Sequence, residues 1–302
     1  MKPAAAKCYR RLYFGALVLA MLALLAGGVI SIVGKTYDCG PRTADPSNLR
    51  QLGQASLIYA YDHKDQFPQA VDVWDYAFQL AESVGVNEPR MWLSKLDPAY
   101  PDSGTISTSS ILDRETTIPR KAHPQLRETK PSVAVVLGKL DMTMPATTPL
   151  LWTRGLQPDG TWAQHSPYGN RGGHIMFMGG NVAYFTDIKA NDRQLTRFDG
   201  KGATSNILEA LPPGCRIGEY EPTPEEKTEW ARINRERAAA EKRRLYAPLL
   251  FIALIWLPFI ALSIYRGVNK RPGCFTVLLW PILILILASI LIPGLWHIGS
   301  MH

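Results

Sequence analysis

The sequence predicts an α+β domain accompanied by three transmembrane helices. Three long apolar stretches contain no charged side chain, and each is long enough to cross the roughly 30 Å hydrocarbon core of a bilayer as a helix. Between the first and the second stretch lies a polar region of ordinary globular composition. In that region, amphipathic helical patterns precede short apolar runs typical of strands.

The apolar stretches divide the 302 residues into five predicted regions. Residues 1–34 hold a cytoplasmic N-terminus and the first transmembrane helix, and residues 35–222 form the α+β domain outside the cytoplasm. A charged helix at 223–245 leads into the second transmembrane helix at 246–266, and the third occupies 273–298. The first stretch also has small residues at which a signal peptide would be cleaved, and this alternative stays open.

Basic side chains set the predicted orientation. The formal net charge is +7, but two basic clusters flank the apolar stretches instead of forming a nucleic-acid-binding surface. The clusters are Lys2, Lys7, Arg10 and Arg11, and Arg266, Lys270 and Arg271. The positive-inside rule places both in the cytoplasm, although Lys242, Arg243 and Arg244 disagree with that orientation. We expect a multi-pass protein of the inner (cytoplasmic) membrane, in contact with membrane lipid, with its large domain extracytoplasmic and no nucleic acid bound.

Helical patterns come first within the large domain. Asp45 and Pro46 have the character of an N-cap and a first helical residue, and apolar residues at helical spacing predict a helix over 46–64. A second apolar stripe starts at Trp74 and ends before Gly85. We interpret both stripes as faces that pack into a core.

The rest of the domain is predicted to contain loops, strands and one more helix. Residues 97–131 are rich in Pro, Ser and Thr and are expected to be loop. Short strands are predicted at Val133–Leu140, Leu150–Arg154, Ile175–Met178 and Val182–Thr186. Thr223 and Glu226 flank Pro224 in the pattern of a capping box, which predicts the start of the charged helix. A charge-rich helix of this kind is expected to be solvated on most of its surface.

The segment Tyr168–Phe185, YGNRGGHIMFMGGNVAYF, raises the question of a site at His174. Two apolar runs flank Gly179, Gly180 and Asn181, and glycine supplies the positive φ that tight hairpin turns need. We therefore predict a structural hairpin turn at these three residues. His174 is expected to be structural or neutral, with its side chain near the domain surface or packed on a loop.

Cysteines are few, and their positions suggest different environments. Cys39 and Cys215 stand at the two ends of the predicted extracytoplasmic domain, where an oxidising compartment favours disulfides. They are candidates for a disulfide, with two unpaired thiols as the alternative. Cys8 and Cys274 fall on the predicted cytoplasmic side and are expected to be free.

Two stretches of the domain are distinctive, SNLRQLGQASLIYAYDHKDQFP (Ser47–Pro68) and PLLWTRGLQPDGTW (Pro149–Trp162). The first resembles the helix that follows the membrane anchor in pseudopilins of type II secretion and type IV pilin-like proteins. The second, with the hairpin, is similar to the end of that domain, which carries an H-x₉-D-G signature. Aligned on the hairpin, Gly169 and Gly179 occupy the signature His and Asp positions, and Gly180 matches. The resemblance implies an N-terminal helix packed on a small antiparallel sheet, and protein partners in the envelope.

Sequence motifs give no indication of catalysis. His165 and His174 are the closest pair of histidines, with no cysteine nearby, and their spacing is not that of metal-binding helices. The P-loop, GxSxG, HExxH and dinucleotide-binding patterns do not occur in the sequence. A catalytic pair of Cys215 and His174 stays open on composition alone. We predict no catalytic residue, no metal site and no cofactor, and do not expect an enzyme.

Two functions are compatible with these patterns. The first is a non-enzymatic, membrane-anchored pseudopilin-like protein whose extracytoplasmic domain binds other proteins in a secretion or envelope assembly. The alternative is a membrane-bound extracytoplasmic enzyme or ligand sensor, with a polar site in the loops 97–131 and 155–172. A cleft with several converging polar groups would favour the alternative.

Overall fold

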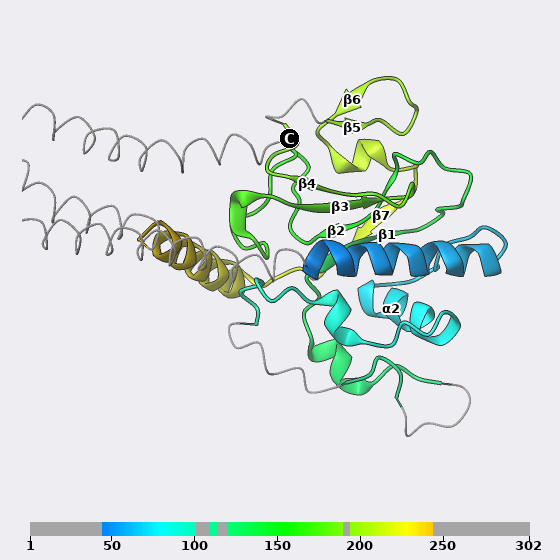
Figure 1. Cartoon of the computed structure of the whole chain (residues 1–302), viewed down its shortest axis with the longest axis horizontal. Helices are drawn as coiled ribbons and strands as arrows, with labels where there is room; N and C mark the ends of the chain where they lie inside the picture. The colour runs from blue at the N-terminus through cyan, green and yellow to red at the C-terminus, as the bar shows by residue number, and fades with distance from the viewer. Residues whose placement is uncertain (1–43, 101–108, 114–119, 190–193, 244–302) are drawn as a thin grey trace, which may run out of the picture. The chain divides into compact units, whose positions relative to one another are not determined.

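Five antiparallel strands form the centre of the domain, in the order β4-β3-β2-β1-β7 (Figure 1). The structure is a computed structural model that describes residues 44–100, 109–113, 120–189 and 194–243. The strands are β1 Val133–Leu137, β2 Pro149–Thr153, β3 Gly173–Phe177, β4 Val182–Phe185 and β7 Arg216–Gly218. A separate two-stranded sheet pairs β5 (Leu195–Thr196) with β6 (Ala203–Thr204).

The central strands are covered on both faces. Every residue of β1, β2 and β3 is buried. Because successive side chains of a strand point to opposite faces, uninterrupted burial requires cover on each side of the sheet. In Figure 1, helix 44–62 and α2 lie on one side of the strands, and β5 and β6 lie on the other.

Helices pack against this sheet. The α-helices among the described residues are 44–62, α2 (Val73–Ser83) and 224–243. Short 3₁₀ helices are η1 Pro89–Trp92, η2 Pro124–Glu128, η3 Gly169–Arg171 and η4 Ile207–Ala210. Helix 44–62 approaches β3 so closely that a Cβ on Gly53 would lie 2.2 Å from the terminal methyl carbon of Met176. Glycine at this position therefore lets the helix lie close to the sheet.

The sequence predicted the start of helix 224–243 correctly, but not the start of helix 44–62. Thr223 and Glu226 form the predicted capping box, since each side chain accepts a hydrogen bond from the backbone N–H of the other residue. At the first helix, Ala44 and Asp45 are already helical, so Asp45 is not the N-cap that the sequence suggested. Its carboxylate is buried and takes part in a polar network described below.

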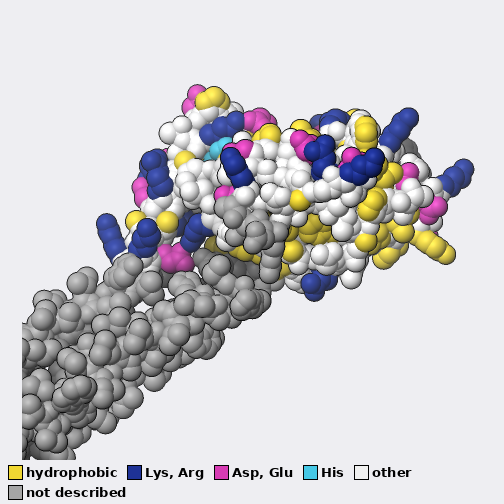
Figure 2. Space-filling model, turned by 90° about the horizontal axis from the view of Figure 1, so that it is seen from above, with side chains coloured by type: hydrophobic (Ala, Val, Ile, Leu, Met, Phe, Trp, Pro, Cys, Tyr) yellow, Lys and Arg dark blue, Asp and Glu magenta, His cyan; other side chains and the backbone are white. Residues whose placement is uncertain are grey.

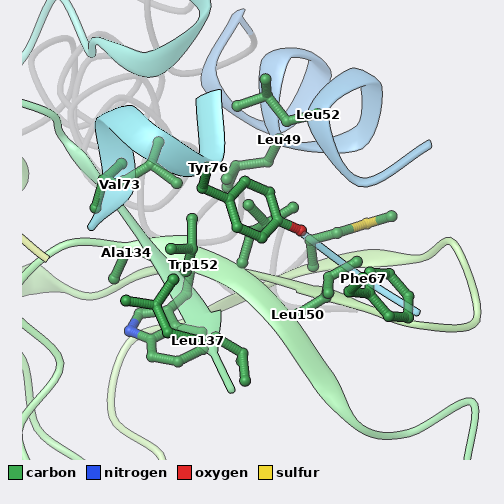
Figure 3. Close-up of a cluster of buried hydrophobic side chains, with 14 of the residues drawn as sticks. Leu49, Leu52, Phe67, Val73, Tyr76, Ala134, Leu137, Leu150 and Trp152 are labelled. Atoms are coloured by element: carbon green, nitrogen blue, oxygen red, sulfur yellow. The ribbon is translucent and has the colours of Figure 1, made fainter. Parts of the chain in front are cut away.

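Apolar side chains from both helices and strands meet in one core (Figure 3). The residues labelled in the figure are Leu49, Leu52, Phe67, Val73, Tyr76, Ala134, Leu137, Leu150 and Trp152. Tyr76 lies in this core with its hydroxyl donating to Ser56, which itself donates to the carbonyl of Leu52. The predicted apolar stripes of helix 44–62 and α2 are therefore core-packing faces, as expected.

One part of the predicted architecture is wrong. Within the ranges that the structure describes, no helix has both the length and the apolar character needed to cross a membrane. Helix 44–62 contains the charged residues Asp45, Arg50 and Asp62, α2 has 11 residues, and helix 224–243 is charged. This finding contradicts the predicted fold class with three transmembrane helices, and with it the predicted multi-pass inner-membrane location. The apolar segments on which both depended, 13–33, 246–266 and 273–298, lie outside the described residues.

Candidate functional site

Gly179, Gly180 and Asn181 connect β3 to β4. The backbone N–H of Gly180 donates to the carbonyl of Phe177, and the N–H of Phe177 donates to the carbonyl of Asn181. Gly180 has a φ of +85°, whereas the φ of Gly179 is not positive. These bonds pair Phe177 with Asn181 and close a three-residue hairpin loop, Met178–Gly180, in which left-handed Gly180 follows a turn. Only Gly180 among the three uses the conformational freedom of glycine.

His174 lies inside the domain instead of near its surface. It sits in β3 opposite Tyr184 of β4, and its side chain is 8% exposed. The rings of Tyr168 and Tyr184 contact it edge-on, with centroids 5.6 and 5.0 Å away. The backbone N–H of His174 donates to the hydroxyl of Thr153, but the ring Nδ1 has no hydrogen-bond partner among the described residues. Of the two placements expected from the sequence, the side chain does not lie at the domain surface but packs on a loop, against Tyr168.

Burial determines the protonation of this histidine. Removal from water disfavours the charged imidazolium, which lowers the pKa of His174 to about 4. The ring is consequently neutral at neutral pH. Within the described ranges, no group of three or more His, Cys, Asp or Glu side chains is placed to hold a metal ion. The pKa of His165 is also lowered. The main cause is burial, and the nearby positive charges of Lys227 and Arg154 add to it.

Cys215 is not brought to His174. It precedes β7, which is separated from β3 by β2 and β1 in the sheet order. Three strand spacings of about 4.8 Å each keep the thiol and the imidazole from acting as a catalytic pair. The Sγ of Cys215 instead lies 3.8 Å from the carbonyl oxygen of Lys139. Cys39 is outside the described residues, so the disulfide stays a prediction.

A buried ion pair lies at the end of β2. Arg154 and Asp97 have side chains that are 1% and 0% exposed, and Nη2 of the arginine donates to Oδ1 of the aspartate at 3.0 Å. Nη1 of Arg154 donates to the carbonyl of Pro131, and the hydroxyl of Ser132 donates to Oδ2 of Asp97 at 2.6 Å. Buried charges are stable only when they are paired and hydrogen-bonded in this way.

Hydrogen bonds continue from this pair to the first described helix. The hydroxyl oxygen of Ser132 accepts a hydrogen bond from the backbone N–H of Ser94 at 2.9 Å. The hydroxyl of Ser94 in turn donates to the carboxylate of Asp45, which also accepts from the hydroxyl of Tyr168. Burial raises the pKa of Asp45, and the two hydroxyl donors oppose that shift. Asp45 is thus tied both to the 94–97 loop and to the segment before the hairpin.

Helix 224–243 docks on the other end of the same network. Its Trp230 is 4% exposed, and the ring lies over the guanidinium of Arg154 with 4.6 Å between the guanidinium carbon and the ring centroid. Lys130 approaches the same ring, with its Nζ 5.5 Å from the centroid. The side-chain amide of Asn234 donates to the carbonyls of Gln164 and Ser166. A cation over an aromatic face is attractive, and desolvation strengthens the attraction.

A small cavity adjoins the network. It has a volume of about 20 Å³, and its polar lining consists of Asp45, Asn48, Ser94, Ser132 and Thr153. A cavity holds one water at roughly 10–15 Å³ measured in this way, so this space suits a single water with several polar partners. It is too small for a substrate or an organic ligand, and it gives no support to the predicted loop-borne catalytic or sensor site.

Sequence reasoning did not identify this network. Asp97 and Tyr168 come from the two loops named for the alternative function, but their partners lie in helices and strands far along the chain. Trp230 is a single apolar residue in a charged run, which gives too weak a periodicity to indicate a docked face. Comparison of the chain with family models, curated proteins and solved structures gave no match.

Proposed function

We propose that this chain is a pseudopilin-like protein that acts by binding other proteins and not by catalysis. The proposal starts from the sequence resemblance over Ser47–Pro68 and over the hairpin region. Helix 44–62, lying against an antiparallel sheet that ends in the β3–β4 hairpin, is the arrangement that such a resemblance leads one to expect.

The outer face of helix 44–62 is the observation on which the proposed activity depends. Its first half exposes polar residues such as Arg50 and Gln51, whereas its second half exposes Ile58 and Tyr61, which are 51% and 79% accessible. Figure 2 looks from the side on which β5 and β6 lie in Figure 1, and there too apolar side chains form patches between charged ones. A tyrosine that is mostly exposed offers a large contact area at small entropic cost, which is why tyrosine is enriched in protein interfaces.

The buried polar groups favour a structural use over a chemical one. Asp97 and Arg154 pair with each other, with Nε of the arginine lacking a hydrogen-bond partner among the described residues, and Asp45 is held by two hydroxyl donors. The cavity that Asp45 lines has room for about one water. A catalytic acid or base must reach a substrate within hydrogen-bonding distance, so these residues are better explained as internal anchors.

Site-specific photo-cross-linking tests the proposal. A photoreactive residue is placed at Tyr61 of the full chain in the producing cells, and a second one at Gln51, another exposed position of the same helix. We expect position 61, more than position 51, to form a cross-link to a second copy of the chain or to another pilin-like subunit. Equal or absent protein cross-links at the two positions would contradict the assignment of this surface.

A substitution completes the test. Tyr61→Ser removes exposed apolar area, and surface changes of this type alter stability by only about 0.5 kcal/mol. The variant should keep its thermal unfolding midpoint and lose the cross-linked partner, detected with the probe moved to Ile58. Leu208→Ser, at a residue 46% exposed on η4, is the matched control and should leave the cross-link intact.

A further inference from the structure

The first and last described helices are joined by one continuous chain of buried polar contacts. The contacts run from Trp230 to Arg154, Asp97, Ser132, Ser94 and Asp45. Each of these six residues is at most 9% exposed. Asp45 and Trp230, the two ends of this chain of contacts, are 185 positions apart in sequence.

Each contact in this chain depends on its neighbours. Arg154 is held on one side by Asp97 and Pro131 and is covered on the other by Trp230, so loss of the tryptophan would admit water to a buried cation. Ser132 orients Asp97 and at the same time accepts from Ser94. Hydrogen-bond networks of this type are worth more than the sum of their pairwise parts, and partial disruption is costly.

Helix 224–243 is attached to the domain mainly by polar contacts, which include ion pairs of Glu226 with Lys130 and of Glu241 with Arg171. Trp230 and Asn234 are its buried residues, and most of its remaining side chains are exposed or half-buried and charged. Arg237 donates to the carbonyl of Leu96, which lies between the network residues Ser94 and Asp97. An element with little buried apolar area opens at a lower free energy than a core element. Its docking therefore depends on the polar contacts.

We propose that this buried chain is a conformational latch that couples the docking of helix 224–243 to the anchoring of helix 44–62 at Asp45. Release of either helix weakens the hold on the other, so the two points at which the described domain continues into the rest of the chain respond together. The coupling does not depend on the function proposed above.

Amide hydrogen exchange of the full-length protein measures this coupling. Ser94→Ala removes the hydroxyl that joins the 94–97 loop to Asp45, without touching helix 224–243. We expect amide exchange in residues 226–241 to become roughly tenfold faster, an effect equal to about 1.4 kcal/mol, which lies within the range for residues in one network. Ser56→Ala is the matched control. It breaks buried hydrogen bonds of helix 44–62 that do not belong to the network between Trp230 and Asp45.

A conservative variant separates the hydroxyl from packing effects. Ser94→Thr keeps the hydroxyl, and the adjoining cavity gives space for the added methyl group. Exchange in residues 226–241 should remain at the wild-type rate in this variant. If Ser94→Ala changes that rate no more than Ser56→Ala does, the proposal is overturned.

The reverse experiment changes a buried residue of the docked helix instead of one in the 94–97 loop. Trp230→Leu alters the docked helix only, and amides of residues 46–52 should then exchange several-fold faster. Arg232→Ala, which removes exposed ion pairs within helix 224–243, is the control and should leave residues 46–52 unchanged. Unchanged exchange of residues 46–52 in Trp230→Leu would also overturn the latch.

Discussion

Burial of His174 makes the fold sensitive to acid. The pKa of this histidine falls from the ordinary value of 6.5 to about 4 because its ring is buried. Between these two values the unfolded chain binds a proton that the folded chain does not, so the free energy of unfolding decreases as the pH falls through that window. Above the unfolded pKa the contribution is fully present. The linkage relation gives a loss of about 2 kcal/mol at pH 5 and about 3 kcal/mol at pH 4.

The variant His174→Phe isolates this contribution. Phenylalanine preserves an aromatic ring between Tyr168 and Tyr184 and cannot titrate. Urea denaturation of the purified protein, followed by tryptophan fluorescence, gives the free energy of unfolding of both forms at pH 8 and pH 5. The difference between the free energies of unfolding of the two proteins at pH 8 measures packing alone. Titration of Asp45 and of other shared groups occurs in both proteins and cancels in the comparison.

The test is how the difference in free energy of unfolding between His174→Phe and the unchanged protein varies with pH. We expect it to shift in favour of His174→Phe by about 2 kcal/mol between pH 8 and pH 5. A shift below about 0.5 kcal/mol would show that the folded protein protonates His174 readily. The aromatic enclosure by Tyr168 and Tyr184 would then not keep the ring neutral, and the reasoning from burial would be refuted.

Two further predictions concern backbone geometry and helix capping. Gly180→Val should lower the free energy of unfolding by about 1–2 kcal/mol in urea denaturation, because φ is +85° and a β-branched residue is strained there, whereas Gly180→Asn should cost less. Equal costs would mean that φ is not the cause. Thr223→Ala should destabilise helix 224–243 by about 1 kcal/mol, measured as faster amide exchange in its first turn, and a slower or unchanged rate would contradict the capping box.

Sequence periodicity predicted the regular elements that are long or rich in β-branched and apolar residues. Val133–Leu140 and Leu150–Arg154 contain β1 and most of β2, and the stripe starting at Trp74 corresponds to α2. The strand β7 was not predicted, since three residues cannot display an alternation. Short strands such as β7 are defined by their partner, here β1, and the partner is not visible in local sequence.

The candidate site was less predictable than the fold. The sequence left two placements open for His174, near the surface or packed on a loop, because an alternation of apolar residues does not show whether the second face of a sheet is also covered. Here Tyr168 covers it, and Tyr168 is positioned by Asp45, more than one hundred residues earlier. Likewise, the pairing of Arg154 with Asp97 depends on the path of the 94–97 loop. Contacts of this range carry no local signal.

The uninterrupted burial of β1, β2 and β3 has a consequence for how this chain can change in evolution. An antiparallel sheet with one wet face tolerates polar replacements at every second strand position. In these three strands that tolerance is lost, so acceptable substitutions should be confined to residues of similar volume at each consecutive position. Variation would then accumulate on β4, whose first three residues are not buried, and relatives would differ first at that edge of the sheet.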